Sequence, residues 1–543
     1  MMRQVEMRLT LERNEDRLFG KILLEQAHDC PDRPFLVTEF SSTSFAEAEE
    51  QTNKLAAGLA NLGVARADRV VLLLANRPEL VLLTLATNKL SAVWVPINSD
   101  YRGEWLLEAI SGSKPSVIVT EPKFVPRLVD IQDRLPAAKV VLIGEDEHSN
   151  LPIAATYQQL LDNEPLTPDY SSQSYGDTSA ILWTSGTTGK SKGVLQSYNA
   201  WIRAIVGGAS IQYDSADDDI CYCALPLYNA GAWITCVYRA LIDGITLVIE
   251  DKFSVSEYWH RINHFGATQT FGIGAMGSFL MNAPESPEDA NNSLRKAFIV
   301  PMAPDLWQRF EQRFNLELIS SGMGMSECMM IMNQLDCPVG TPTYSLGRPV
   351  ADIDVKLCDD EGNEVPVGEP GEICIRPKKP YTLFSGYFDN PEGTAAAFRG
   401  DWFLSGDMAR QDPETGIYFF TDRKKDAVRF AGRNISTLEV ESVVRRHPQV
   451  ADVAAFGIPS KEIESEDELK LSVIRAAGSE LSAEQICQFI NDNAPYFFVP
   501  RYLDFVDELP YTPTQKVQKF ELRKRGNSGN TWDLKASDFK VKR

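Results

Sequence analysis

Residues 184–193 read TSGTTGKSKG and follow directly on the apolar run Ala180-Ile181-Leu182-Trp183. An apolar strand followed by serine, threonine and glycine offers hydroxyls and open backbone N–H groups to phosphate oxygens, and glycine permits the backbone conformations that such a loop needs. The stretch therefore predicts a phosphate-binding loop after a strand. Its Gly189-Lys190-Ser191 also ends the Walker A motif of kinases and ATPases, so the kind of loop has to be decided.

The Walker A interpretation fits only in part. The motif requires a glycine five positions before Gly189, where this chain has Thr184, and it requires a helix directly after Lys-Ser, where Gly193 intervenes. An acid that could serve as Walker B does follow, in the run 247–251 (LVIED). The loop taken alone therefore leaves two hypotheses open, a P-loop enzyme and an adenylate-forming enzyme in which Lys192 would be the important lysine.

Composition and charge narrow the class of protein. The chain has 543 residues, 43% of them hydrophobic, and a formal charge of -21. Its length predicts more than one domain, and the negative charge argues against nucleic-acid binding, which needs a basic face. Nine scattered cysteines are typical of free thiols in a reducing compartment. The N-terminus has no apolar signal segment and no run is long enough to span a membrane, so we expect a cytoplasmic protein.

The order of apolar and amphipathic segments predicts the fold class. Short apolar strands such as 70–74, 117–119, 140–143 and 246–249 alternate with helical patterns such as 45–62 and 257–265, which is typical of α/β folds with parallel sheets. From about residue 351 the pattern becomes alternating and turn-rich, and predicts β-hairpins. We therefore expect a large N-terminal domain, 1–424, with two α/β subdomains and a β-rich subdomain. A small mobile α+β domain, 425–543, should follow a hinge near Lys425.

Four further segments carry residue types suited to nucleotide chemistry. Residues 322–327 (GMGMSE) present a hydroxyl and the carboxylate of Glu327, a suitable Mg²⁺ ligand beside phosphate oxygens. Asp407 lies on a tight turn and could accept the two hydroxyls of a ribose. Arg423 supplies a cation sixteen residues later, and Lys516 lies in a turn near the C-terminus. Each segment alone is a common kind of surface turn, but their order and spacing are far more specific.

Taken together, these motifs resemble those of adenylate-forming enzymes, the superfamily of acyl-CoA synthetases, nonribosomal adenylation domains and firefly luciferase. The resemblance spans nearly the whole chain. The matching segments are 184–193 for the phosphate loop, 323–327 for the Tyr-Gly-x-Thr-Glu motif, 405–407 for the Arg/Thr-Gly-Asp motif, 422–426 for the hinge and 515–516 for the C-terminal Gly-Lys motif. Within the superfamily, the chain looks most similar to acyl-CoA ligases of the crotonobetaine/carnitine-CoA ligase-like and medium-chain groups.

The resemblance implies a two-step reaction with ATP, Mg²⁺ and coenzyme A. A carboxylic acid is first activated as an acyl-adenylate with release of pyrophosphate, and the acyl group then passes to the thiol of coenzyme A with release of AMP. Lys516 and Glu327 are implied as catalytic residues, with Glu327 also the Mg²⁺ ligand. The residues implied in nucleotide or coenzyme binding are Thr184, Ser185, Gly186, Thr187, Thr188, Gly189, Lys192, Met302, Met323, Gly324, Ser326, Asp407, Arg423 and Gly432.

The acid pocket and the acyl acceptor are less closely specified. The resemblance places the pocket at Tyr228, Asn229, Trp233 and Gly322, and the absence of an acid near Tyr228 disfavours an amino-acid substrate. Tyr228, Trp233 and Tyr238 could form an aromatic cage for a carnitine-like ammonium. Met323 stands where a tyrosine usually stacks on adenine. Two alternatives stay open, an acyl-AMP ligase that loads a carrier protein and a non-catalytic adenylate-binding homologue. A homodimer also stays open.

Overall fold

The computed structural model describes residues 11–145, 150–184, 191–300, 302, 304–320, 322–359, 361–423, 428–430, 433–435, 437–463, 466–510, 517 and 519–542. Its internal contacts divide the chain into two compact units. The large unit comprises residues 1–99, 110–183 and 193–422, and the small unit comprises 100–109, 184–192 and 423–543. The domain boundary expected at residues 424 and 425 stays a prediction.

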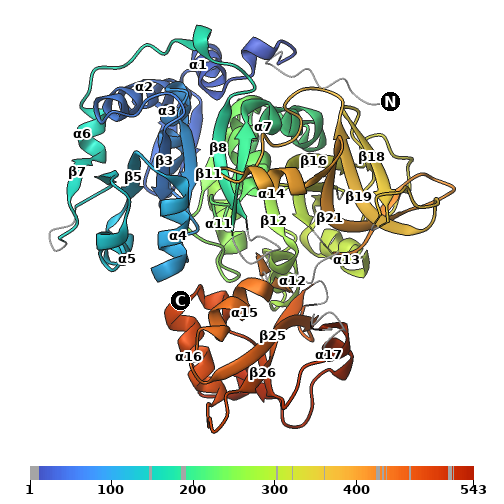
Figure 1. The fold of residues 1–543 in the computed structure, drawn as a ribbon. Coiled ribbons are helices and arrows are strands. Elements are labelled where there is room, and N and C mark those ends of the chain that lie inside the picture. Colours follow the sequence, from blue (N-terminus) through green and yellow to red (C-terminus); the bar gives the residue numbers. More distant parts are fainter. Residues whose placement is uncertain are drawn as a thin grey trace. The chain divides into compact units, whose positions relative to one another are not determined.

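Two mostly parallel sheets form the centre of the large unit (Figure 1). In the described residues each has seven strands. The order of the first is β14 (Glu317–Leu318), β13 (Lys296–Val300), β12 (Gln269–Ile273), β10 (Ile220–Cys223), β11 (Thr246–Ile249), β1 (Pro34–Val37) and β2 (Ser42–Ser44). The order of the second is β7 (Ile153–Thr156), β6 (Lys139–Leu142), β5 (Val117–Thr120), β3 (Arg69–Leu73), β4 (Val93–Pro96), β8 (Thr178–Thr184) and β9 (Lys192–Ser197). The strands expected at 70–74, 117–119, 140–143 and 246–249 are thus confirmed.

Helices connect these strands, as the alternating sequence pattern predicts. The helix α2 (Phe45–Asn61) begins at a capping box in which the Ser44 hydroxyl accepts from Glu47 N and the Glu47 carboxylate accepts from Ser44 N. The others are α1 (Phe19–Asp29), α3 (Pro78–Lys89), α4 (Gly103–Ser113), α5 (Val125–Val129), α6 (Tyr157–Leu161), α7 (Tyr198–Ala204), α8 (Ser210–Tyr213), α9 (Ala230–Ala232), α10 (Tyr238–Asp243), α11 (Tyr258–Phe265), α12 (Gly274–Asn282) and α13 (Pro304–Phe314). A further helix, α14 (Pro391–Ala396), lies between strands of the β-rich part described below. The two expected helices, 45–62 and 257–265, are confirmed within a residue.

An aromatic cluster fills the core of the large unit. Trp94, Trp201, Trp233 and Tyr238 are fully buried, and the Trp94 and Trp233 rings lie 4.3 Å apart. The Trp233 indole N–H donates to Leu227 O at 2.6 Å, which satisfies its polar atom inside the core. Trp233 is the first residue of a π-helical turn, η6 (Trp233–Val237), which follows the short helix α9. A second π-helical turn, η5 (Ile205–Ala209), follows α7.

The β-rich part of the large unit confirms the hairpins expected after residue 351. β18 (Ile353–Cys358) pairs antiparallel with β19 (Pro370–Pro377), which pairs with β21 (Trp402–Gln411). Smaller strands complete it: β15 (Met323–Met325), β16 (Cys328–Asn333), β17 (Arg348–Pro349), β20 (Phe398–Arg399) and β22 (Tyr418–Arg423). The ion pair between buried Arg203 and half-buried Asp352, with N–O distances of 2.6 Å, connects α7 to the start of this part.

The small unit is an α+β fold with its own apolar core. Its sheet has the order β25 (Val450–Pro459), β26 (Asp467–Arg475), β27 (Tyr502–Phe505) and β28 (Trp532–Asp533), and a hairpin of β23 (Val428–Phe430) and β24 (Arg433–Ile435) precedes it. Its helices are α15 (Thr437–Arg445), α16 (Ala483–Asn493) and α17 (Lys519–Arg525). Together with the two sheets of the large unit, this arrangement is the expected α/β class.

Candidate active site

The two ends of the phosphate loop are hydrogen-bonded to each other. Thr184 ends β8 and Lys192 begins β9; the Thr184 hydroxyl donates to Lys192 O at 3.4 Å, and the Ser191 hydroxyl donates to Thr184 O at 2.9 Å. These bonds close the base of the loop. The residues implied at its tip, Ser185, Gly186, Thr187, Thr188 and Gly189, lie outside the described residues.

Ser326 and Glu327 form the tip of a tight hairpin. Met325 at the end of β15 is directly opposite Cys328 at the start of β16, which leaves only these two residues to make the turn. Gly322 and Gly324 allow the strands to approach, because an added Cβ would lie 2.7 Å from Met332 O and 2.2 Å from Met329 O, respectively. The motif glycines therefore have a structural role in holding the turn together, beside any role toward a ligand.

The Glu327 carboxylate is held in place by a residue that the sequence analysis did not identify. The Tyr387 hydroxyl donates to Glu327 Oε1 at 2.8 Å, and both side chains are largely buried. The turn backbone is fixed as well: Phe384 N donates to Glu327 O at 2.8 Å, and the Gln196 side-chain amide donates to Ser326 O. Burial, and then the neighbouring carboxylate, raise the pKa of Tyr387 well above its usual value, so this tyrosine stays a proton donor.

Asp407 is positioned by a β-bulge. In the pairing of β19 with β21, Cys374 is opposite Leu404 and Glu372 is opposite Met408. One residue of β19 therefore faces three residues of β21, 405–407. Gly406 has φ of 75°, and its N–H donates to the buried Glu372 carboxylate at 2.9 Å. The Ser405 hydroxyl accepts from Asp407 N at 3.1 Å. A bulge of this kind redirects side chains out of the regular strand pattern, which suits a residue that has to reach a ligand.

The residues assigned to the acid pocket lie in different environments. Tyr228 is half-buried and Asn229 is exposed, in a turn closed by a bond from Asn229 N to Pro226 O. Trp233 and Tyr238, by contrast, are fully buried in the aromatic core. The aromatic cage suggested for Tyr228, Trp233 and Tyr238 is therefore wrong, because two of its three rings are core residues with no exposed face.

The remaining residues of the expected site are placed only in part. Met302 is 5% exposed, and an added Cβ at Gly277 would lie 3.0 Å from its terminal methyl, so it packs on α12. Met323 is half-buried against the core of the β-rich part. Arg423 is the last residue of β22. Lys425, Gly432 and Lys516 lie outside the described residues.

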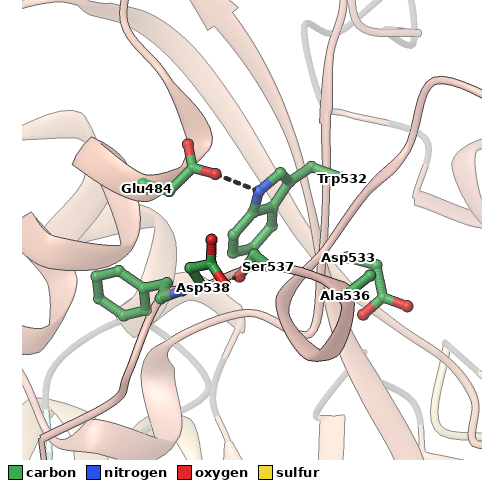
Figure 2. Close-up of a pocket in the computed structure, with 7 residues that line it drawn as sticks. Glu484, Trp532, Asp533, Ala536, Ser537 and Asp538 are labelled. Atoms are coloured by element: carbon green, nitrogen blue, oxygen red, sulfur yellow. Dashed lines mark hydrogen bonds between the residues drawn. The ribbon is translucent and has the colours of Figure 1, made fainter.

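A separate cavity of about 560 Å³ lies in the small unit. It is lined by Glu484, Trp532, Asp533, Ala536, Ser537, Asp538 and Phe539. Figure 2 shows the Glu484 carboxylate directed at the Trp532 indole, whose N–H donates to Glu484 Oε1 at 2.7 Å. Asp533 is engaged with Arg501 at 2.8 Å. No residue of the predicted site lines this cavity.

Comparison with known proteins identifies the family. Residues 23–388 match the AMP-binding enzyme family, and residues 439–516 match the AMP-binding enzyme C-terminal domain. The chain therefore belongs to the AMP-binding family of adenylate-forming enzymes. This removes the P-loop kinase hypothesis. Glu250, one of the two acids in the run 247–251 suggested for Walker B, is ion-paired with Arg261 at 2.7 Å.

Curated relatives of the chain are named as CoA ligases. The crotonobetaine/carnitine–CoA ligase of Salmonella choleraesuis (strain SC-B67) is 30% identical over 487 residues, 88% of this chain and 93% of that protein. The enzyme of the same name from Salmonella arizonae is 31% identical over 498 residues, 89% and 94% of the two chains. These relatives agree with the first of the two acyl-CoA ligase groups suggested by the sequence.

Solved structures share the fold. An amide bond synthetase from Marinactinospora thermotolerans superposes with a TM-score of 0.80 at 24% identity, covering 94% of this chain and all of that one. An o-succinylbenzoate CoA synthetase variant from Bacillus subtilis gives 0.78 at 23% identity, with coverage of 93% and 98%. In the described part of the chain, no helix is both long and apolar enough to cross a membrane, and all nine cysteines are unbridged.

Proposed function

We propose that the protein is an ATP-dependent acyl-CoA ligase. The observation that carries the proposal is the hairpin tip at Ser326 and Glu327, where a carboxylate next to a hydroxyl is fixed by a buried tyrosine and by backbone hydrogen bonds. Family models match both the large N-terminal part of the chain and its C-terminal part, which the two half-reactions would use in turn. The curated relatives are named as CoA ligases.

The donor set at this tip suits Mg²⁺. The groups presented are a carboxylate and a hydroxyl, and Mg²⁺ prefers oxygen ligands, usually one or two carboxylates together with substrate phosphates. Among the described residues, no cluster of three or more acidic, histidine or cysteine side chains could hold a metal ion. When bound at Glu327, the ion would supply positive charge next to the phosphates.

In the first half-reaction the substrate carboxylate attacks the α-phosphorus of ATP. The new bond joins the carboxylate oxygen to the α-phosphorus, and the bond to the bridging oxygen of the β-phosphate breaks, releasing pyrophosphate. Both reactants are anions, so the reaction needs positive charge and N–H donors at the phosphates. We assign Lys516 to the α-phosphate and the acid. The β- and γ-phosphates would be held by Thr184, Ser185, Gly186, Thr187, Thr188, Gly189 and Lys192.

In the second half-reaction the thiol of coenzyme A attacks the acyl carbonyl. The carbon–sulfur bond forms, the bond between the acyl carbon and the phosphate oxygen breaks, the thiol proton passes to water and AMP leaves. Asp407, on its bulge, and Arg423 would hold the ribose, while Met302, Met323 and Gly324 would contact the nucleotide. Gly432 would let the pantetheine arm pass along the backbone after the small domain rotates about Lys425.

The acid itself would bind near Gly322, Tyr228 and Asn229. Because Trp233 is fully buried, we assign it a packing role beneath Tyr228 and Asn229 and not a contact with the acid. The side-chain amide of Asn229 is exposed, so it offers a polar group where the acid would bind. We therefore expect polar acids to be used, and a panel of short, medium, aromatic and betaine acids would identify them.

The proposal predicts that the two half-reactions separate at Lys516. Lys516→Ala should lower acid-dependent ATP–pyrophosphate exchange by about 10²–10³-fold, because it removes the charge that stabilises the transition state. Thioester formation from a supplied acyl-adenylate and coenzyme A should stay within about threefold of wild type. The control is Lys524→Ala, an exposed lysine of the small unit with 70% of its side chain accessible. Equal loss of both half-reactions in Lys516→Ala would contradict the assignment.

A further inference from the structure

The segment 385–388 runs along the strand that leaves the phosphate loop. Phe388 N donates to Gly193 O at 2.7 Å, Leu195 N donates to Gly386 O at 3.0 Å, and Tyr387 and Val194 form an antiparallel bridge. Gly193 is the last residue of TSGTTGKSKG. The exit of the phosphate loop is therefore bonded, residue by residue, to the backbone on either side of Tyr387.

The stretch 384–388, which includes this segment and the residue before it, also holds Glu327. The Tyr387 hydroxyl donates to the carboxylate at 2.8 Å, and three residues earlier Phe384 N donates to the Glu327 carbonyl at 2.8 Å. The Tyr387 and Phe384 rings contact each other, with centroids 4.9 Å apart, inside the core of the β-rich part. Both the backbone and the side chain of Glu327 are thus fixed from one short stretch of chain.

Local structure fixes the direction of Tyr387. Gly386 has φ of 121°, a conformation that favours glycine, and an added Cβ would lie 3.2 Å from Thr394 Cγ2. The Thr394 hydroxyl accepts from Tyr387 N and donates to Asn390 O, both at 2.9 Å. The glycine sets the turn, and Thr394 anchors the tyrosine backbone to the first turn of α14.

We propose that Tyr387 is a positioning residue that fixes the Glu327 carboxylate relative to the exit of the phosphate loop, so that metal and phosphates bind in one geometry. The inference rests on the proposed function. Tyr387 is a neutral donor, so it restricts the orientation of the carboxylate without supplying a positive charge. Hydrogen-bond partners of metal ligands typically contribute 10–100-fold in metal affinity or activity, which sets the expected size of the effect.

The test is Tyr387→Phe, which removes the hydroxyl and keeps the ring. The Mg²⁺ concentration for half-maximal ATP–pyrophosphate exchange should rise about tenfold, while the rate at saturating Mg²⁺ should fall less than about threefold. Binding of Mn²⁺ in the presence of ATP, followed by electron paramagnetic resonance, should weaken by a similar factor. In a Glu327→Gln background the same substitution should change Mn²⁺ binding less than twofold, because the partner carboxylate is already absent.

The matched control is Tyr381→Phe, which removes a hydroxyl from a tyrosine of the same part of the chain that is 44% exposed. It should change neither Mg²⁺ dependence nor Mn²⁺ binding. The inference is overturned if Tyr387→Phe keeps both within twofold of wild type, or if it loses activity at all Mg²⁺ concentrations together with a melting temperature lowered by more than about 5 °C. If the wild-type protein shows no acid-dependent exchange, the proposed function fails, and Mn²⁺ binding with ATP still decides the role of Tyr387.

Discussion

Two buried carboxylates of the large unit, Asp243 and Glu327, are held in different ways. Asp243, at the end of α10, accepts from Ser210 at 2.6 Å, from Ser215 at 3.0 Å and from the fully buried Arg239 at 3.3 Å. Arg239 in turn lies 3.9 Å from the centroid of the Tyr213 ring. Arg239 also donates to Gln269 Oε1 of β12 at 2.7 Å, so the network joins helices to the first sheet and its role is structural.

Glu327 belongs to a different kind of arrangement. It lies at the tip of a two-residue turn, next to the Ser326 hydroxyl, and its carboxylate is oriented by the hydroxyl of Tyr387. Asp243 is paired with the positively charged Arg239, whereas Glu327 is paired with the uncharged hydroxyl of Tyr387. The comparison suggests that Asp243 is used for stability and Glu327 for binding. Substitutions at the two acids should therefore change different quantities.

The largest effect is expected from Asp243→Ala. Removing one partner of a buried ion pair leaves the other charge without compensation, so the free energy of unfolding should fall by about 3–5 kcal/mol. Exchange activity per folded molecule should stay within about twofold of wild type. Urea unfolding followed by circular dichroism measures the loss, and the exposed residue Asp218, replaced by alanine, is the control. A stable variant with lost activity would reverse the roles assigned to the two acids.

Glu327→Gln should show the opposite behaviour. The amide keeps an oxygen that can accept from Tyr387, so unfolding should be nearly unchanged, but the charge that would neighbour the metal is lost. ATP–pyrophosphate exchange should fall by about 10²–10³-fold at fixed Mg²⁺, as for loss of one electrostatic stabiliser. Glu369→Gln, at an exposed position of the β-rich part, is the control. An exchange rate within threefold of wild type would remove Glu327 from the site.

A third buried pair gives a smaller effect that depends on pH. Lys89 is fully buried and donates to Glu49 Oε2 at 2.7 Å, yet burial lowers its pKa to about 8. The folded state therefore binds fewer protons than the unfolded state above pH 8, so this lysine makes stability rise with pH, by about 1 kcal/mol from pH 8 to pH 9. The difference in unfolding free energy between wild type and Lys89→Met should follow this slope. A difference independent of pH would show that Lys89 titrates normally.

Much of the fold follows from local sequence patterns. The capping box at Ser44 and Glu47 precedes a helix whose end was expected within one residue, and the alternation at 352–357 predicted the β18–β19 hairpin. These features depend on neighbouring residues and are visible in short windows. The bulge at Asp407 is only partly visible in the local sequence. Its glycine predicts a turn, but the register shift depends on the partner strand β19.

The parts that were missed depend on contacts between distant segments. Tyr387 is 60 residues from Glu327 in sequence, and nothing in the local pattern marks its hydroxyl as a partner for that carboxylate. Trp233 was assigned to the pocket, together with Tyr228 and Asn229, because the family resemblance places the pocket there. The π-helical turn η6 and the packing of four aromatic side chains bury it instead. Neither the turn nor the packing could be derived from residue spacing.

The most direct test of the proposed function is acid-dependent ATP–pyrophosphate exchange across a panel of short, medium, aromatic and betaine acids, followed by AMP release with and without coenzyme A. We predict exchange with at least one acid, dependent on Mg²⁺, and faster AMP release when coenzyme A is added. Exchange without any effect of coenzyme A would point to another acyl acceptor. No acid-dependent exchange over the whole panel, from protein that is folded and binds ATP, would contradict the assignment as an acyl-CoA ligase.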